Sequence, residues 1–229
     1  MAGLSEFTRN MDWAGLTSFL LSAAAVLLCL TVHEVSHGLA AYILGDPTAK
    51  SQNRLSLNPL RHLDPFGTLM MLVAGFGWAR PVPVDMRYFK HPKSGMALTA
   101  LAGPISNFVL AYGALLVRAG LFPVYMTRGG NLITAVVQFL SVLAVMSVGL
   151  GIFNLIPIPP LDGSKVLEGI LPDRVYYTIL RYERIGMLAL VAILWSGIAD
   201  YPLWAARSWV INWMTEGTLW LFRLVSNLI

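Results

Sequence analysis

Two histidines and a glutamate lie within one short segment, His33-Glu34-Val35-Ser36-His37, which has the pattern H-E-x-x-H. In a helix, residues four apart share one face with Cβ atoms about 5–6 Å apart, so both imidazoles can bind the same Zn²⁺ ion. Glu34 can reach a water on that ion as a general base. The segment therefore predicts metal-assisted hydrolysis, with hydrogen bonding of the three side chains to neighbouring helices as the structural alternative.

A third protein ligand is needed, because a catalytic zinc normally has three. Asp162 is the best candidate, since the prolines between residues 157 and 160 end a long apolar run and force an extended chain, while Gly163 permits a tight turn. His33 lies roughly 20 residues, or about 30 Å, into the first apolar helix, so both groups are expected at a similar depth. In isolation, Asp162-Gly163 would indicate only a turn.

Other thiol and imidazole groups are weaker candidates. Cys29, one turn before His33, could supply a thiolate but is expected to be a small buried packing residue. His62 and His91 lie in a basic loop, where structural or solvated histidines are expected. Asp162 remains the preferred third ligand.

The composition places these groups in a membrane protein. Of 229 residues, 56% are apolar and 12% are charged, whereas an average soluble domain has about 25% charged residues, so a soluble globular protein is nearly excluded. The net charge of +4 is small and the charges are scattered, so no nucleic-acid partner is expected. A single cysteine excludes a disulfide framework and a cysteine-only metal cluster.

Apolar runs predict the helices that position the site, since a membrane-spanning helix needs about 20 apolar residues. Four runs reach or approach this length: 13–32, continued as an apolar helix to about 44, then 94–117, 129–161 and 185–199. The first is too long for the apolar part of a signal peptide, which is the alternative. Residues 202–229 are expected to form a last span or a tryptophan-rich interfacial helix. Residues 66–79 are too few for a span and predict a re-entrant or interfacial element.

Basic residues indicate which side of the membrane each loop occupies. Seven lie between the first helix and Gly95, and only Arg118 and Arg128 lie between the second and third runs. By the positive-inside rule, segment 46–94 is expected in the cytoplasm. The seven are Lys50, Arg54, Arg61, Arg80, Arg87, Lys90 and Lys93.

Segment 46–94 shows strand-like patterns rather than helical ones. Residues 53–58 alternate polar and apolar side chains, as a half-buried strand does. Residues 81–85 must be extended, since Pro81 and Pro83 exclude their predecessors from the α region, and these prolines confine the segment to a sheet edge. A small sheet at the membrane surface is expected, whose edge could bind an unwound substrate by strand addition.

Four sequence features resemble the site-2 protease family of intramembrane zinc metalloproteases. They are H-E-V-S-H at 33–37, A-G-P-I-S-N at 102–107, N-x-x-P-x-x-x-x-D-G at 154–163 and the loop sequence G-F-G-W-A-R-P-V-P-V at 75–84. The resemblance covers about residues 10–165. Family members commonly carry PDZ domains or a CBS-type tail, and this chain resembles the short, compact branch that has neither.

The resemblance implies one zinc ion per chain, held by His33, His37 and Asp162, with Glu34 as the general base. It also implies cleavage of a substrate's transmembrane segment, as in regulated intramembrane proteolysis.

Two asparagines lie in the matching motifs, Asn107 on the second core helix and Asn154 on the third. They are expected to contact the substrate backbone or the oxyanion, and helix-to-helix hydrogen bonding is the alternative.

The expected fold is a polytopic α-helical membrane protein with a three-helix catalytic core. One membrane-embedded domain covers residues 1–229, with the core at about 10–165, C-terminal helices at about 183–229, and a small β or re-entrant element on the cytoplasmic side. The expected setting is the plasma membrane, with the lipid bilayer and a transmembrane protein or peptide substrate as partners.

Two other functions use similar residues. A metal-ion transporter also has His and Asp within helices, but such transporters usually show duplicated halves, and no second H-E-x-x-H segment occurs here. A scaffold with structural zinc would need a closed set of four ligands, and three good ones are visible. The sequence favours the protease and does not indicate the oligomeric state.

Overall fold

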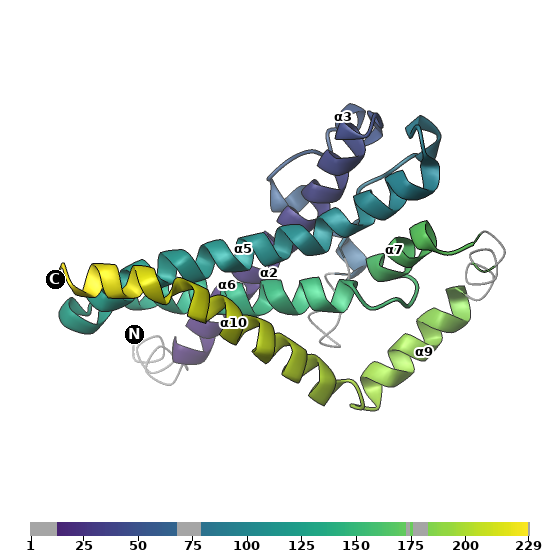
Figure 1. Ribbon diagram of the computed structural model, residues 1–229. Coiled ribbons are helices and arrows are strands. Elements are labelled where there is room, and N and C mark those ends of the chain that lie inside the picture. Colours follow the sequence, from purple (N-terminus) through teal and green to yellow (C-terminus); the bar gives the residue numbers. More distant parts are fainter. Residues whose placement is uncertain (1–12, 68–78, 173–174, 176–182, 229) are drawn as a thin grey trace, which may run out of the picture.

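Among the described residues, three helices are long and apolar enough to cross a membrane (Figure 1). The computed structural model describes residues 13–67, 79–172, 175 and 183–228. The candidate spans are α2 (Trp13–Ile43), α5 (Pro92–Arg128) and α6 (Asn131–Asn154). Their lengths of 31, 37 and 24 residues exceed the about 20 residues that a bilayer requires. The prediction of a polytopic helical membrane protein is therefore confirmed.

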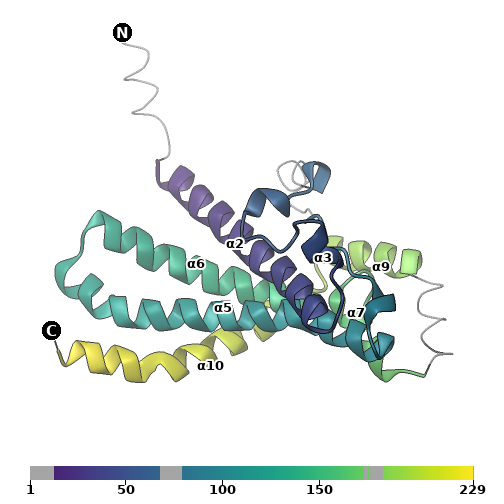
Figure 2. The same ribbon diagram turned by 90° about the horizontal axis from the view of Figure 1, so that it is seen from above.

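Two further helices, α9 (Glu183–Trp195) and α10 (Asp200–Ser226), follow the core. They meet at a bend of 84°, so the pair is a broken span or a re-entrant hairpin. α10 lies alongside α5 and α6 in both views (Figures 1 and 2). Its outer surface is rich in tryptophan, as predicted, and the exposed rings belong to Trp204, Trp209, Trp213 and Trp220.

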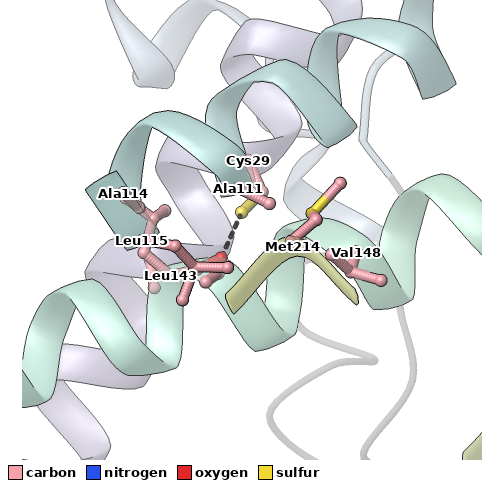
Figure 3. Close-up of a cluster of buried hydrophobic side chains, with 9 residues drawn as sticks. Cys29, Ala111, Ala114, Leu115, Leu143, Val148 and Met214 are labelled. Atoms are coloured by element: carbon pink, nitrogen blue, oxygen red, sulfur yellow. Dashed lines mark hydrogen bonds between the residues drawn. The ribbon is translucent and has the colours of Figure 1, made fainter. Parts of the chain in front are cut away.

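Helices α2, α5, α6 and α10 pack around a core that contains many small side chains (Figure 3). Small residues let helices in a membrane approach each other closely. Cys29 belongs to this core, with its thiol 3.9 Å from the carbonyl oxygen of Leu143 and an exposed fraction of 1%. Cys29 is therefore a packing residue, as the sequence predicts. The labelled neighbours in the figure are Ala111, Ala114, Leu115, Val148 and Met214.

The chain leaves α6 through an irregular stretch, residues 155–161, and then forms the short helix α7 (Asp162–Ile170). Three prolines in this stretch lack the N–H groups that would continue a helix. A Cβ at Gly163 would collide with the carbonyl oxygens of Leu155 and Ile156. Only glycine therefore lets α7 begin so close to the end of α6, and this placement brings Asp162 into the bundle.

The described parts of segment 46–94, residues 46–67 and 79–94, contain short helical turns rather than the expected sheet. These turns are α3 (Thr48–Ser51), η1 (Pro59–Arg61) and η2 (Met86–Tyr88). Residues 54–58 and 80–85 are outside any strand, and the backbone bridge described in this segment joins Leu63 to Ala79. Most of residues 66–79, where a re-entrant element is predicted, lies outside the described residues.

The prediction of a strand at 53–58 is wrong, because side chains rather than a backbone ladder connect this stretch to its neighbours. Arg54 Nη2 donates to the carbonyl oxygens of Arg80 and Pro81 at 2.7 and 3.2 Å. Since prolines lack an N–H group, Pro81 cannot donate to a ladder either. An alternating sequence cannot distinguish these side-chain hydrogen bonds of Arg54 from the backbone pairing of two strands.

Candidate metal and catalytic site

The side chains of His33, His37 and Asp162 meet where the C-terminal part of α2 faces the start of α7. Asp162 Oδ2 lies 3.0 Å from His33 Nε2 and 3.1 Å from His37 Nε2, and the two Nε2 atoms are 3.0 Å apart. All three side chains are buried, and they form the one such group of potential metal ligands among the described residues. A tetrahedral zinc ion with ligands at about 2.0–2.1 Å separates its ligand atoms by about 3.3 Å, so two imidazoles and a carboxylate at this spacing fit zinc.

The second ring nitrogen of each histidine is also occupied. His37 Nδ1 donates to the carbonyl oxygen of Thr99 at 2.7 Å. His33 Nδ1 lies 3.3 Å from the amide nitrogen of Asn107, whose Oδ1 is buried without a partner among the described atoms. Turning this amide over lets Oδ1 accept from His33 Nδ1–H, which satisfies both groups. Each histidine then presents Nε2 to the metal, as second-ring hydrogen bonds commonly ensure.

Helix α5 approaches both histidines closely at Gly103. A Cβ at this position would lie 2.5 Å from the His37 ring and 2.7 Å from the His33 ring. The motif A-G-P-I-S-N at residues 102–107 does not by itself predict a role for Gly103. Its position one helical turn before Asn107 is the signal that could have assigned this role, because both residues then face α2.

Glu34 lines a cavity of about 300 Å³ beside the three ligands. Its Oε2 accepts a hydrogen bond from the backbone N–H of Val82 at 2.9 Å. This hydrogen bond joins the irregular segment 80–85 to α2 and fixes one oxygen of the Glu34 carboxylate. The sequence did not predict this contact. The cavity is also lined by Pro81, Val84, Leu150, Phe153, Asn154 and Lys165.

Asp162 is in contact with charged or polar groups on two sides. Its Oδ1 lies 3.7 Å from Lys165 Nζ, one turn further along α7. Burial raises the pKa of Asp162, but its contacts with the imidazole rings of His33 and His37 outweigh this effect, so the pKa lies well below its usual range. The carboxyl group is therefore ionised, which is the form that binds a metal. The i,i+3 spacing of Asp162 and Lys165 is the sequence signal that indicates this contact.

The two predicted asparagines have different surroundings. Asn154 lines the cavity, and its Nδ2 donates to the carbonyl oxygen of Leu150 at 3.1 Å. Asn107 is 0% exposed, and its backbone carbonyl accepts from Ser147 Oγ at 2.8 Å. Asn107 thus lies between helices and against His33, whereas Asn154 is accessible to a molecule in the cavity.

The other histidines lie elsewhere. His62 is 1% exposed, and its Nε2 donates to the carbonyl oxygen of Ser56 at 2.7 Å, so it is a structural histidine. His91 is exposed and precedes α5. Neither belongs to the group of His33, His37 and Asp162.

Comparisons with known proteins find a peptidase family and relatives named as zinc metalloproteases. The family model of peptidase family M50 matches residues 119–197. The chain is 40% identical over 179 residues to "Putative zinc metalloprotease YwhC" of Bacillus subtilis, an alignment that covers 78% of this chain and 82% of that protein. It is 30% identical over 224 residues to "Putative zinc metalloprotease Rip2" of Mycobacterium tuberculosis strain H37Rv, covering 96% and 78%.

A third relative is "Putative zinc metalloprotease Rip2" of Mycolicibacterium smegmatis, 28% identical over 196 residues, with 83% of this chain and 71% of that protein covered. No solved structure matches this chain significantly.

Proposed function

Because this chain belongs to peptidase family M50, we propose that it is an intramembrane zinc metalloprotease that hydrolyses peptide bonds in or next to transmembrane segments of other proteins. The observation that carries the proposal is the convergence of His33, His37, Asp162 and Glu34 at one cavity. Three of these residues lie on a helix that is long and apolar enough to span a membrane. Burying ionisable side chains in such a helix costs free energy, and the residues that carry them are usually functional.

The catalytic roles follow from the contacts of each side chain. His33, His37 and Asp162 would hold the zinc ion, which would supply a Lewis acid that lowers the pKa of a water molecule towards about 7. Glu34, whose Oε2 already accepts from the N–H of Val82, would take a proton from the attacking water through Oε1 as the water oxygen adds to the carbonyl carbon of the scissile peptide bond. The protonated Glu34 would then donate this proton to the amine nitrogen as the C–N bond breaks, in the manner of general acid–base catalysis.

The substrate has to be unwound before its peptide bond can react, because each carbonyl of a helix accepts a bond within the helix. We place the unwound stretch along Pro81, Val82 and Val84, which line the cavity, and opposite Asn154. Recognition through the main chain predicts broad sequence tolerance near the cut, with a preference for helix-weakening glycine or proline in the substrate. Residues 53–58 do not line the cavity, so they are not retained as a binding edge.

The sidedness of the protein is part of the proposal. The seven basic residues between α2 and Gly95 favour a cytoplasmic position for this loop, and the site lies at the same end of α2. The protein is accordingly placed in the plasma membrane with its active site towards the cytoplasm.

A metal-ion transporter is less well supported. Transporters of this kind are usually built from repeated halves with paired sites. The described residues contain one group of potential metal ligands, and the relatives are named as metalloproteases.

The proposal is tested with the purified protein in lipid vesicles, incubated with a panel of single-span membrane proteins. Cleavage of at least one substrate is expected to stop when a chelator removes the metal and to return when zinc is added. A zinc-loaded protein that transports metal ions and cleaves none of the substrates would contradict the proposal.

A further inference from the structure

Outside the metal site, three arginine side chains line one cleft of about 270 Å³ in the loop between α2 and α5. Arg54, Arg61 and Arg80 come from separate parts of this loop, and none of the described residues that line the cleft is acidic. Three like charges therefore face one small volume, and the described residues of its walls provide no opposite charge.

Arg54 is the buried member of this cluster, with an exposed fraction of 8%. Its Nη2 donates to the carbonyl oxygens of Arg80 and Pro81, while its Nε has no hydrogen-bond partner among the described atoms. Burial and the nearby charge of Arg80 lower the pKa of Arg54, and Glu34 opposes this effect. A buried cation is usually paired with an anion, and the Oε2 atom of Glu34 is already bonded to Val82.

The two outer arginines still have free donors. Arg61 Nη1 donates to the carbonyl oxygen of Asn53 at 2.8 Å, which orients the guanidinium and leaves its other N–H groups available. Arg80 is exposed, and among the described residues no carboxylate lies within ion-pair distance of its side chain. A guanidinium presents several N–H donors in a planar fork that matches the oxygens of a phosphate group.

The cleft also carries apolar side chains that suit a membrane surface. Leu60 lines the cleft and is 71% exposed, and nearby Leu57 is 74% exposed. Both lie in the loop that connects two candidate membrane spans. Clusters of basic residues next to spanning helices attract anionic lipids, and exposed leucines can enter the headgroup boundary.

We propose that the cleft formed by Arg54, Arg61 and Arg80 binds a phosphate group at the membrane surface. A phospholipid headgroup and free inorganic phosphate share this chemistry, and the experiment below distinguishes them. The exposed leucines favour the lipid.

Phosphate binding would also act on the metal site, a consequence that rests on the proposed function. Arg54 holds the carbonyl oxygens of Arg80 and Pro81, and the next residue, Val82, donates to Glu34. A phosphate that neutralises the repulsion between Arg54 and Arg80 would hold segment 80–82 in place. Anionic lipid is therefore expected to stabilise the position of Glu34.

The binding test uses the purified full chain in detergent, titrated with short-chain phosphatidylglycerol, with short-chain phosphatidylcholine, or with inorganic phosphate. Binding is measured by calorimetry for the wild type and for the double variant Arg61→Gln/Arg80→Gln, which changes exposed side chains only. The control double variant is Lys50→Gln/Lys90→Gln, since it removes the same charge from exposed positions of the same loop that do not line the cleft. Zinc content and the unfolding temperature report the fold of each variant.

Phosphatidylglycerol is expected to bind the wild type and the control with affinities within about twofold of each other, and the arginine variant about tenfold or more weakly, because charge-assisted hydrogen bonds to phosphate are lost. Binding of inorganic phosphate alone, with the same dependence on the arginines, would identify free phosphate as the ligand of the same cleft. Equal affinities of the folded arginine variant and the wild type for both probes would overturn the proposal. The proposal would also be overturned if phosphatidylcholine and phosphatidylglycerol bound the wild type equally and the folded arginine variant bound neither lipid more weakly. None of these measurements depends on cleavage activity. Failure of the protease proposal would therefore leave the binding result unaffected.

Discussion

The side-chain and backbone groups that contact the Nδ1 atoms of His33 and His37 determine whether the two imidazoles point towards a common ion. Thr99 and Asn107, both on α5, bond the Nδ1 atoms of His37 and His33. Such contacts fix the tautomer and the ring orientation of a metal-binding histidine. Asn107 therefore has a defined contact on His33, whereas Asn154 lines the cavity in which a substrate would lie.

Replacing Asn107 and Asn154 separately should distinguish these roles. Asn107→Ala is expected to weaken zinc binding by about 10–100-fold, because His33 loses the partner of its second nitrogen. Asn154→Ala should keep the zinc affinity of the wild type and lose cleavage activity. Competition with a chromophoric chelator measures the affinity, and an unchanged value for Asn107→Ala would show that His33 is oriented by other contacts.

Gly103→Ala should damage the metal site through sterics alone. The added methyl group would lie 2.5–2.7 Å from both imidazoles, so a loss of about 1–3 kcal/mol of stability is expected together with weaker zinc binding. Gly113→Ala on the same helix is the matched control, because no atom lies within 4 Å of its added Cβ. Thermal unfolding in detergent measures both variants, and equal stabilities would contradict the close packing of α5 on the histidines.

At the scale of elements, the start of α7 positions Asp162, the proposed third ligand. The prolines after α6 stop that helix, and Gly163 lets the chain turn against the carbonyl oxygens of Leu155 and Ile156. Asp162 is the first residue of α7, so any shift of this helix moves the carboxylate relative to His33 and His37.

Gly163→Ala should therefore lower zinc occupancy and cleavage without unfolding the bundle. Its Cβ would collide with backbone atoms, which cannot move aside as a flexible side chain can. Gly186→Ala is a suitable control, since its nearest neighbours would lie at an ordinary 3.6 Å. Elemental analysis gives the zinc content, and full occupancy in Gly163→Ala would mean that α7 tolerates the change.

Much of this arrangement could be predicted from the sequence, because the signals are local. The i,i+4 spacing places His33 and His37 on one face of a helix. The prolines before Asp162 end the preceding helix. The contact of Val82 with Glu34 could not be predicted, since it joins residues 48 positions apart through a backbone group that carries no sequence signal. The strand expected at 53–58 failed for a similar reason, because alternation does not reveal that Arg54 bonds the carbonyl oxygens of the opposite segment.

At the scale of the whole molecule, charge distribution determines the orientation in the bilayer. The loop between α2 and α5 carries most of the nearby basic residues, while the connection between α5 and α6 is two glycines, with Arg128 at the end of α5 beside it. The account therefore requires the first loop, and the metal site beside it, to face the cytoplasm.

Thiol labelling checks this orientation. In a Cys29→Ala background, which removes the only cysteine, Lys90→Cys places a single thiol in the loop before α5, and Arg128→Cys places one at the exposed end of α5 next to α6. In intact cells, a membrane-impermeant reagent is expected to label position 128 and to label position 90 only after the membrane is opened. The reverse pattern would invert the proposed topology.

The most direct test of the account is the Glu34→Gln variant in lipid vesicles, assayed for zinc content and for cleavage of a single-span substrate. Glutamine keeps an oxygen that can accept from Val82 and leaves the three ligands unchanged, but it cannot take a proton from water. The account predicts one zinc ion per chain and a loss of cleavage of about 10²–10⁴-fold. Cleavage at the wild-type rate by the zinc-loaded variant would contradict the role of Glu34 as the base.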